Sequence, residues 1–213
     1  MSTHHDHDHD HHDHKHPTQP DVDGPLTYHQ RLEIAVRELL IEKGIVTADE
    51  VRRAIEAMDA RTPAQGARIV AHAWADPAYK KKLLTEPREA SLELGVDPGV
   101  TKLVVVENTD KVHNLVVCTL CSCYPRSILG LPPDWYKSRA YRSRAVREPR
   151  KVMSEFGLEI PDDIAVRVHD STADMRYLVL PKRPKGTEGW SEEKLAAIVT
   201  RDTMIGIAEA RIP

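Results

Sequence analysis

Three cysteines, the only ones in the chain, lie within six consecutive positions: Cys118, Cys121 and Cys123. An odd number of cysteines at such close spacing is a poor framework for disulfide bonds. In a reducing compartment, clustered thiols are more often metal-binding or catalytic. The cluster therefore predicts a chain that folds around a metal site or a reactive thiol.

The composition narrows the class of protein around this cluster. A length of 213 residues suits one moderate domain with an extension, and apolar residues make up 40% of the chain. A net charge of −3 argues against general nucleic-acid binding. We find neither an apolar run of the roughly 20 residues that a membrane span needs nor an apolar signal region. We therefore expect a cytoplasmic protein that does not enter a membrane.

Residues 1–27 form a low-complexity tail rich in histidine and aspartate. Most of the twelve histidines fall between His4 and His16, where they largely alternate with Asp. Such a tract has no apolar face, so we expect it to be disordered. Its imidazoles and carboxylates could chelate divalent metal weakly. The sequence leaves open whether it binds metal or is a purification tag or solvated tail.

Residues 28–98 are expected to form a helical N-terminal arm. Apolar residues recur at helical spacing from Leu32 to Leu40, and Gly44 marks the end of that helix. Thr47 and Glu50 match a capping box, which predicts the start of the next helix. Short helices are marginal alone in water, so they must pack on this chain or on a partner. We favour a partner.

Residues 99–213 are expected to form a domain of mixed strands and helices. Runs rich in β-branched and aliphatic residues predict strands at 103–106, 115–117, 164–168 and 177–180. Helical patterns cover residues 150–156 and 191–199. Because these elements do not alternate as regular βαβ units, the sequence predicts an α+β domain.

The spacing of the cysteines would allow a claw around one metal ion. The thiolates of Cys121 and Cys123 flank the amide nitrogens of Ser122 and Cys123, which could bind the same ion in one plane. Cys118 could add its thiolate from one axial side and leave the other position open, as catalysis requires. Amide nitrogens lose their protons only to a strongly Lewis-acidic ion, and thiolates suit transition metals. Cobalt or iron in the +3 state meets both demands, and its open position would polarise a nitrile or acidify a water.

Spacing alone leaves other interpretations open. A structural zinc site could use the three thiolates and a histidine such as His113. The Cys118–Cys121 spacing could also be a redox pair. Cysteines that only fill a core are the remaining possibility. The three cysteines therefore do not identify the metal.

The residues around the cysteines carry a more specific signal. Residues 117–125 (VCTLCSCYP) closely resemble the metal-binding signature of the nitrile hydratase α subunit. Further matching strings follow, at residues 129–138 (LGLPPDWYKS), 141–144 (YRSR), 146–150 (VREPR), 176–181 (RYLVLP), 186–190 (GTEGW) and 199–202 (VTRD). The resemblance spans about residues 30–207, nearly the whole chain outside the tail.

This resemblance implies a site, a fold and a partner. Thr119 resembles the cobalt type, so Co(III) is expected and iron(III) is the second choice. The implied ligands are the sulfurs of Cys118, Cys121 and Cys123 and the amides of Ser122 and Cys123. Cys121 would be a sulfinic acid and Cys123 a sulfenic acid whose oxygen acts as nucleophile or base. The catalytic residues would be Cys123 and Ser122. Arg176 would contact the ligand residues and not the metal itself.

The same resemblance implies a four-layer αββα domain over residues 99–213. It also implies a β subunit, in an αβ heterodimer or a pair of them, and a metal-loading activator protein. The β subunit would supply arginines that contact the cysteine oxygens, so this chain is similar to half of an enzyme. The implied reaction is the hydration of a nitrile to an amide.

Arg126 departs from the commonest pattern of this family. Many cobalt-type members have Trp here, lining the substrate pocket, so Arg126 would add positive charge to that pocket. The related metal subunit of thiocyanate hydrolase resembles the chain at Arg126 and in its His- and Asp-rich start. A thiocyanate hydrolase-like subunit is therefore one alternative to nitrile hydration. A non-catalytic cobalt- or zinc-binding protein is the other, suggested by the His-rich tail together with the cysteine cluster.

Overall fold

The computed structural model describes residues 25–121 and 123–212. The chain divides into two compact units, Met1–Glu50 and Val51–Pro213. Residues 1–24 of the predicted tail lie outside the described residues, so its disorder and metal binding stay predictions, as does the domain boundary at residue 98. No helix in the described part is long and apolar enough to cross a membrane.

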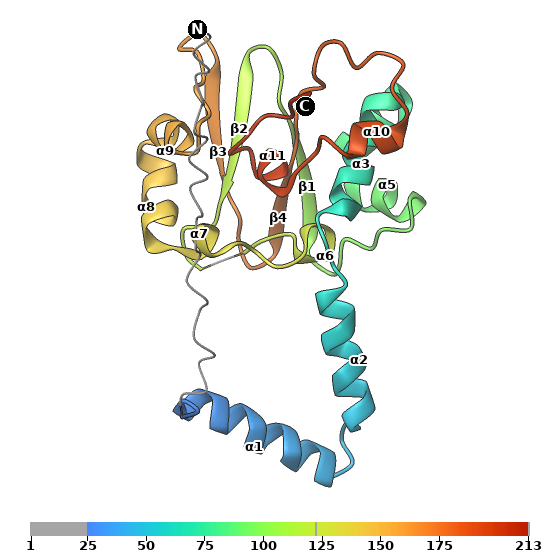
Figure 1. Ribbon diagram of the computed structural model, residues 1–213, viewed down its shortest axis with the longest axis vertical. Helices are drawn as coiled ribbons and strands as arrows, with labels where there is room; N and C mark the ends of the chain where they lie inside the picture. The colour runs from blue at the N-terminus through green and yellow to red at the C-terminus, as the bar shows by residue number, and fades with distance from the viewer. Residues whose placement is uncertain (1–24, 122, 213) are drawn as a thin grey trace, which may run out of the picture. The chain divides into compact units, whose positions relative to one another are not determined.

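The first unit contains helix α1 (Tyr28–Glu42; Figure 1). Thr27 and Gln30 cap its N-terminus reciprocally. The amide of Gln30 donates to the hydroxyl of Thr27, and the Gln30 side chain accepts from the Thr27 amide at 2.8 Å. No residue of α1 is buried, and Leu32, Val36 and Leu39 are each almost half exposed. The partner expected for this helix therefore stays a prediction.

Helix α2 (Ala48–Asp59) begins at the capping box that the sequence predicts. The Thr47 amide donates to Glu50 Oε2 at 2.8 Å, and the Glu50 amide donates to the Thr47 hydroxyl at 3.1 Å. This hydrogen bonding holds the pKa of Glu50 below its ordinary value. Ile55 and Met58 remain exposed on this helix.

Helices α3 (Ala64–Ala75), α4 (Pro77–Thr85) and α5 (Pro87–Glu93) pack on their own chain. Asp76 caps α4 by accepting the amides of Ala78 and Tyr79. Most of α3 is buried, and α4 and α5 contact strand β1. These three helices therefore follow the alternative that the sequence left open, because other elements of this chain cover much of their apolar surface.

The four predicted strands are confirmed and form two parallel pairs. Strand β1 (Lys102–Glu107) pairs with β4 (Met175–Leu180), and β2 (Val112–Val117) pairs with β3 (Ala165–Asp170). Parallel neighbours need long crossover connections, so each pair joins segments far apart in the chain. The register places Asp170 opposite Val117, the residue before Cys118.

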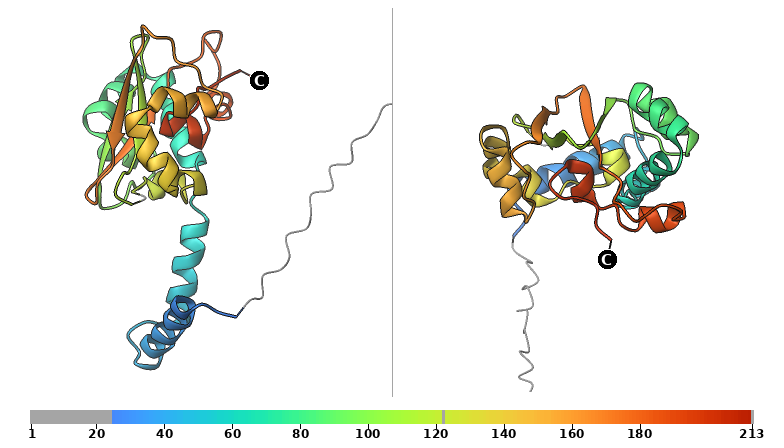
Figure 2. Two further views of the ribbon diagram at one scale, coloured as in Figure 1. Left: turned by 90° about the vertical axis from the view of Figure 1, so that its left-hand side faces the viewer. Right: turned by 90° about the horizontal axis from the view of Figure 1, so that it is seen from above.

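Helices cover the two strand pairs from both sides (Figures 1 and 2). Helices α8 (Arg139–Arg147) and α9 (Pro149–Glu155) contact β2 and β3, whereas α4 and α5 contact β1. Strands β2 and β4 contact each other between them. The remaining short helices are α6 (Arg126–Leu129), α7 (Asp134–Lys137), α10 (Glu192–Ala196) and α11 (Arg201–Ile205). The mixed α+β class is confirmed, and the order helices–sheet–sheet–helices agrees with the implied αββα arrangement.

Candidate metal centre

The three cysteines meet in one loop directly after β2. Cys118 is fully buried at the end of the strand, Cys123 is half-buried and Cys121 is exposed. Their sulfurs lie 3.5 Å apart from Cys118 to Cys121 and 3.2 Å apart from Cys121 to Cys123. All three sulfurs lie within 4.8 Å of one another, close enough to bind one ion. Ser122, the predicted amide ligand between them, lies outside the described residues.

Polar side chains from three other elements hold this loop, and the end of the strand before it, at several backbone positions. Asp170 accepts the Thr119 amide at 2.9 Å and the Thr119 hydroxyl at 2.6 Å. Tyr136 donates its hydroxyl to the Cys123 carbonyl at 2.9 Å, and Tyr141 donates to the Val116 carbonyl at 2.7 Å. Burial raises the pKa of both tyrosines, so these hydroxyls stay protonated donors. These three side chains therefore hold the backbone between Val116 and Cys123 through hydrogen bonds.

Sequence reasoning did not single out these supporting residues. Tyr136 and Tyr141 belong to the strings that resemble the family, but nothing local indicates which carbonyls they reach. Asp170 ends its strand, and only the pairing of β3 with β2 brings it to Thr119. Predicting the contact of Asp170 with Thr119 requires the register of β2 against β3, which a single sequence does not contain.

We expect Asp170→Ala to lower the metal content of the protein and its activity together. The variant leaves the Thr119 amide and hydroxyl without their shared acceptor, so the loop loses its fixed position. Residues that support metal ligands typically contribute about 10–100-fold to affinity. Metal content and affinity would be measured against Asp163→Ala, which removes an exposed carboxylate elsewhere. Equal metal affinity in the two variants would contradict this role.

Burial has the largest effect on the pKa of Cys123. Burial, followed by contact with the Cys121 and Cys118 sulfurs, raises the pKa of Cys123 to about 12, and the Arg176 guanidinium opposes that rise. A thiol with this pKa is protonated at neutral pH. Metal binding to it must therefore release a proton, which a strongly Lewis-acidic ion favours.

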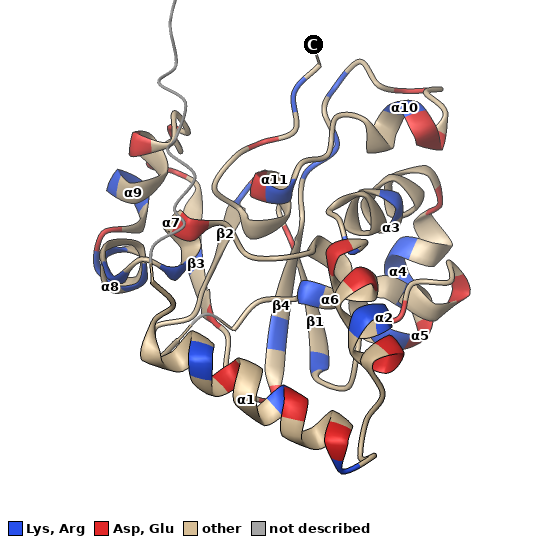
Figure 3. Ribbon diagram, turned by 60° about the horizontal axis from the view of Figure 1, so that its bottom comes forward, with Lys and Arg blue, Asp and Glu red and all other residues tan. Residues whose placement is uncertain are grey.

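A pocket of ≈ 330 Å³ opens beside the sulfurs of Cys121 and Cys123. Arg126 from α6 and Arg176 from β4 line it, and among the described residues no acidic side chain does. Figure 3 shows basic segments on α6 and β4, the elements that carry these two arginines. Arg176 is held by its own loop, because its Nη1 donates to the carbonyls of Thr172, Ala173 and Met175. The predicted Arg126 and Arg176 thus lie in the same pocket as the thiols, although their roles stay predictions.

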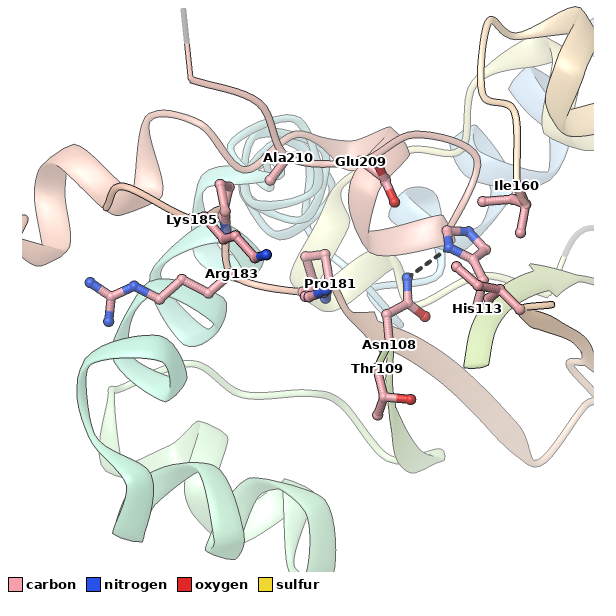
Figure 4. Close-up of a pocket in the computed structure, with 12 residues that line it drawn as sticks. Asn108, Thr109, His113, Ile160, Pro181, Arg183, Lys185, Glu209 and Ala210 are labelled. Carbon is pink, nitrogen blue, oxygen red and sulfur yellow. Dashed lines mark hydrogen bonds between the residues drawn. The ribbon is translucent and has the colours of Figure 1, made fainter. Parts of the chain in front are cut away.

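A second pocket of ≈ 230 Å³ contains His113, the proposed fourth ligand of a zinc site (Figure 4). His113 Nε2 donates to the Gly206 carbonyl at 2.8 Å, so its Nδ1 accepts from Asn108 at 3.3 Å. Burial keeps the pKa of His113 below its ordinary value, which favours this neutral form. Within the described chain, the group suited to a metal holds the three cysteines alone. A zinc site completed by His113 is therefore wrong, because folding commits both ring nitrogens elsewhere.

Comparisons of sequence and of structure with known proteins point to the same family. A sequence model described as nitrile hydratase, alpha chain, matches residues 27–208. The cobalt-containing nitrile hydratase subunit alpha of Pseudonocardia thermophila is 50% identical over 181 residues, covering 83% of this chain and 88% of that protein. Thiocyanate hydrolase subunit gamma of Thiobacillus thioparus is 47% identical over 189 residues, covering 83% of this chain and 78% of that protein.

Solved structures extend the agreement to the fold. A structure of recombinant thiocyanate hydrolase with partially modified cobalt centres matches with a TM-score of 0.82 at 45% identity. The match covers 88% of this chain and 92% of that chain. Since the family model spans most of the chain and relatives near 50% identity share its length, this chain belongs to the nitrile hydratase α-chain family.

Proposed function

We propose that this chain is the α subunit of a cobalt-type nitrile hydratase, which hydrates nitriles to amides. The observation that supports this most is the meeting of Cys118, Cys121 and Cys123 within 4.8 Å at the edge of a pocket. The cobalt-containing relatives support the choice of metal over iron(III). The α-chain family implies a β subunit as partner, and α1 and α2 have exposed apolar side chains for such a contact.

The proposed ligands are the sulfurs of Cys118, Cys121 and Cys123 with the amides of Ser122 and Cys123. When bound, a trivalent ion supplies a Lewis-acid centre that polarises a nitrile or lowers the pKa of a water. Cys121 and Cys123 are proposed to be oxidised, with the oxygen on Cys123 moving the proton of the attacking water. Arg176 would hold that oxygen in place with its positive charge. A cytoplasmic location and a metal-loading activator complete the proposal.

Co-expression with a β subunit of the family and with cobalt tests this function. The purified complex is expected to convert propionitrile to propionamide, to contain about one cobalt per α chain, and to have two oxidised cysteines by mass spectrometry. A complex fully loaded with cobalt that turns over no nitrile would contradict the proposal. If it also left thiocyanate unchanged, a non-catalytic metal-binding role would remain.

A thiocyanate hydrolase-like activity is the second candidate, and Arg126 favours it. The guanidinium lines the pocket beside the thiols together with that of Arg176, which suits an anionic substrate. The 47% identity to thiocyanate hydrolase subunit gamma agrees with this possibility. Release of carbonyl sulfide and ammonia from thiocyanate, faster than amide from any nitrile, would establish it.

Arg126→Trp is expected to move specificity towards apolar nitriles. The change removes a cation from the pocket and adds an aromatic face, so an apolar nitrile gains contact while an anion loses a charged partner. Loss of a charged hydrogen bond is worth about 1.5–3 kcal/mol, so the ratio of kcat/KM should move at least about tenfold. The ratio for benzonitrile over thiocyanate measures it, with Arg139→Trp on the exposed side of α8 as control. An unchanged ratio would show that Arg126 contacts no substrate.

A further inference from the structure

Residues 98–101, called the wall below, are a short segment between two neighbouring pockets. On one side they line the ≈ 330 Å³ pocket that contains Cys121, Cys123 and Arg126. On the other side, Val100 and Thr101 also line a second pocket of ≈ 760 Å³. Residues 85–89, which include Arg88, line the same pocket. Whatever fixes this wall therefore sets how wide the pocket beside the thiols can be.

Buried apolar residues lie on either side of the exposed part of the wall. Pro98 and Leu103 are buried, whereas the Val100 side chain is fully exposed. Gly99 and Thr101 are half-buried, and Lys102 begins β1, where its amide donates to the Asp174 carbonyl. A short segment anchored at its ends and exposed between them opens easily unless polar contacts hold it.

Arg88 on α5 supplies such a contact. Its Nη1 donates to the Gly99 carbonyl, and its Nη2 lies 3.8 Å from Asp97 Oδ1. The same Asp97 oxygen accepts the Gly99 amide at 2.9 Å. The Gly99 backbone is thus held at its carbonyl by Arg88 and at its amide by Asp97, and a guanidinium makes stronger hydrogen bonds than a neutral donor.

Gly99 allows the wall to approach α6 very closely. Its φ of +87° is a conformation that other residues rarely adopt, and a Cβ there would lie 2.8 Å from the Ser127 hydroxyl. Ser127 follows Arg126 in the first turn of α6, and both line the thiol pocket. The wall is therefore seated directly against the helix that carries Arg126.

We propose that Arg88 is a positioning residue that holds residues 98–101 against α6 and so limits the size of nitrile that the site accepts. Without the Arg88 contact, the wall moves towards the neighbouring pocket and the thiol pocket widens. This inference rests on the proposed nitrile hydration. It concerns the width of the pocket and leaves the metal ligands unchanged.

Three variants of the cobalt-loaded complex with its β subunit test this role. Arg88→Ala removes the contact, Arg88→Lys keeps a shorter cation that can still donate, and Glu89→Ala changes an exposed neighbour on the same helix. The readout is the ratio of kcat/KM for 1-naphthonitrile over propionitrile. We expect Arg88→Ala to raise this ratio about tenfold, the lower end of what pocket contacts discriminate. Arg88→Lys should partly restore the wild-type ratio, and Glu89→Ala should leave it and the cobalt content unchanged.

Amide hydrogen exchange gives a readout independent of turnover. Exchange over residues 99–102 should rise at least about tenfold in Arg88→Ala, while exchange in the core strands stays unchanged. If the wild-type complex hydrates nitriles while Arg88→Ala changes neither the kcat/KM ratio nor the exchange at residues 99–102, the role of Arg88 is overturned and the proposed function stands. If the wild type hydrates no nitrile, the proposed function has failed, and unchanged exchange would then overturn the role of Arg88 as well.

Discussion

Replacing Cys121 by alanine is expected to abolish cobalt binding and activity. Its sulfur lies between the other two, 3.5 Å from that of Cys118 and 3.2 Å from that of Cys123. Its loss therefore removes the central member of the cluster. Loss of a group that merely supports a ligand costs about 10–100-fold in metal affinity, so loss of a ligand should exceed that range. Metal analysis of the purified variant and its activity with the β subunit measure the effect.

Leu120→Ala provides a control in the same loop. The Leu120 side chain is 85% exposed, so its truncation removes little packing within this chain. The control should retain cobalt, which would show that metal loss in Cys121→Ala comes from the sulfur and not from a disturbed loop. Full activity in an alanine variant of Cys118, Cys121 or Cys123 would refute the site.

The second large effect is expected at Gly206, which ends α11. Its φ is +88°, and a Cβ there would lie 1.9 Å from the Asn114 carbonyl oxygen on β2. Backbone atoms of a buried strand cannot move aside as a side-chain end can. We therefore expect Gly206→Ala to lower the free energy of unfolding by more than about 3 kcal/mol, the upper part of the usual range for one substitution. Urea unfolding followed by circular dichroism would measure it.

Gly157→Ala separates the clash from backbone strain. Gly157 has a similar φ of +80°, but a Cβ there meets nothing within 4 Å. Gly157→Ala should lower the free energy of unfolding only by the strain of a left-handed conformation, about 1–2 kcal/mol. The difference between the two variants then reports the close approach of α11 to β2. Equal losses would show that this approach is not tight in solution.

Local patterns were enough to predict the four strands and the start of α2, although they did not indicate α6, α7, α8 or α11. The capping box at Thr47 and Glu50 and the four strands are confirmed because each depends on neighbouring residues. Backbone caps and β-branched runs act over a few positions, so their effect is visible in a short string. The same holds for the cysteine loop, in which spacing alone brings three sulfurs within reach of one another.

Contacts between distant segments could not be predicted in this way. The pairing of β2 with β3 brings Asp170 to Thr119 across 51 positions, and no local pattern encodes strand register. The strand order also brings Arg176 to the pocket of Arg126 and the thiols. His113 is buried among acceptors and donors that occupy both its nitrogens, which excludes it as a metal ligand. The sequence thus defined the metal-binding group, whereas the packing of distant elements selected what surrounds it, because burial and register depend on the whole chain.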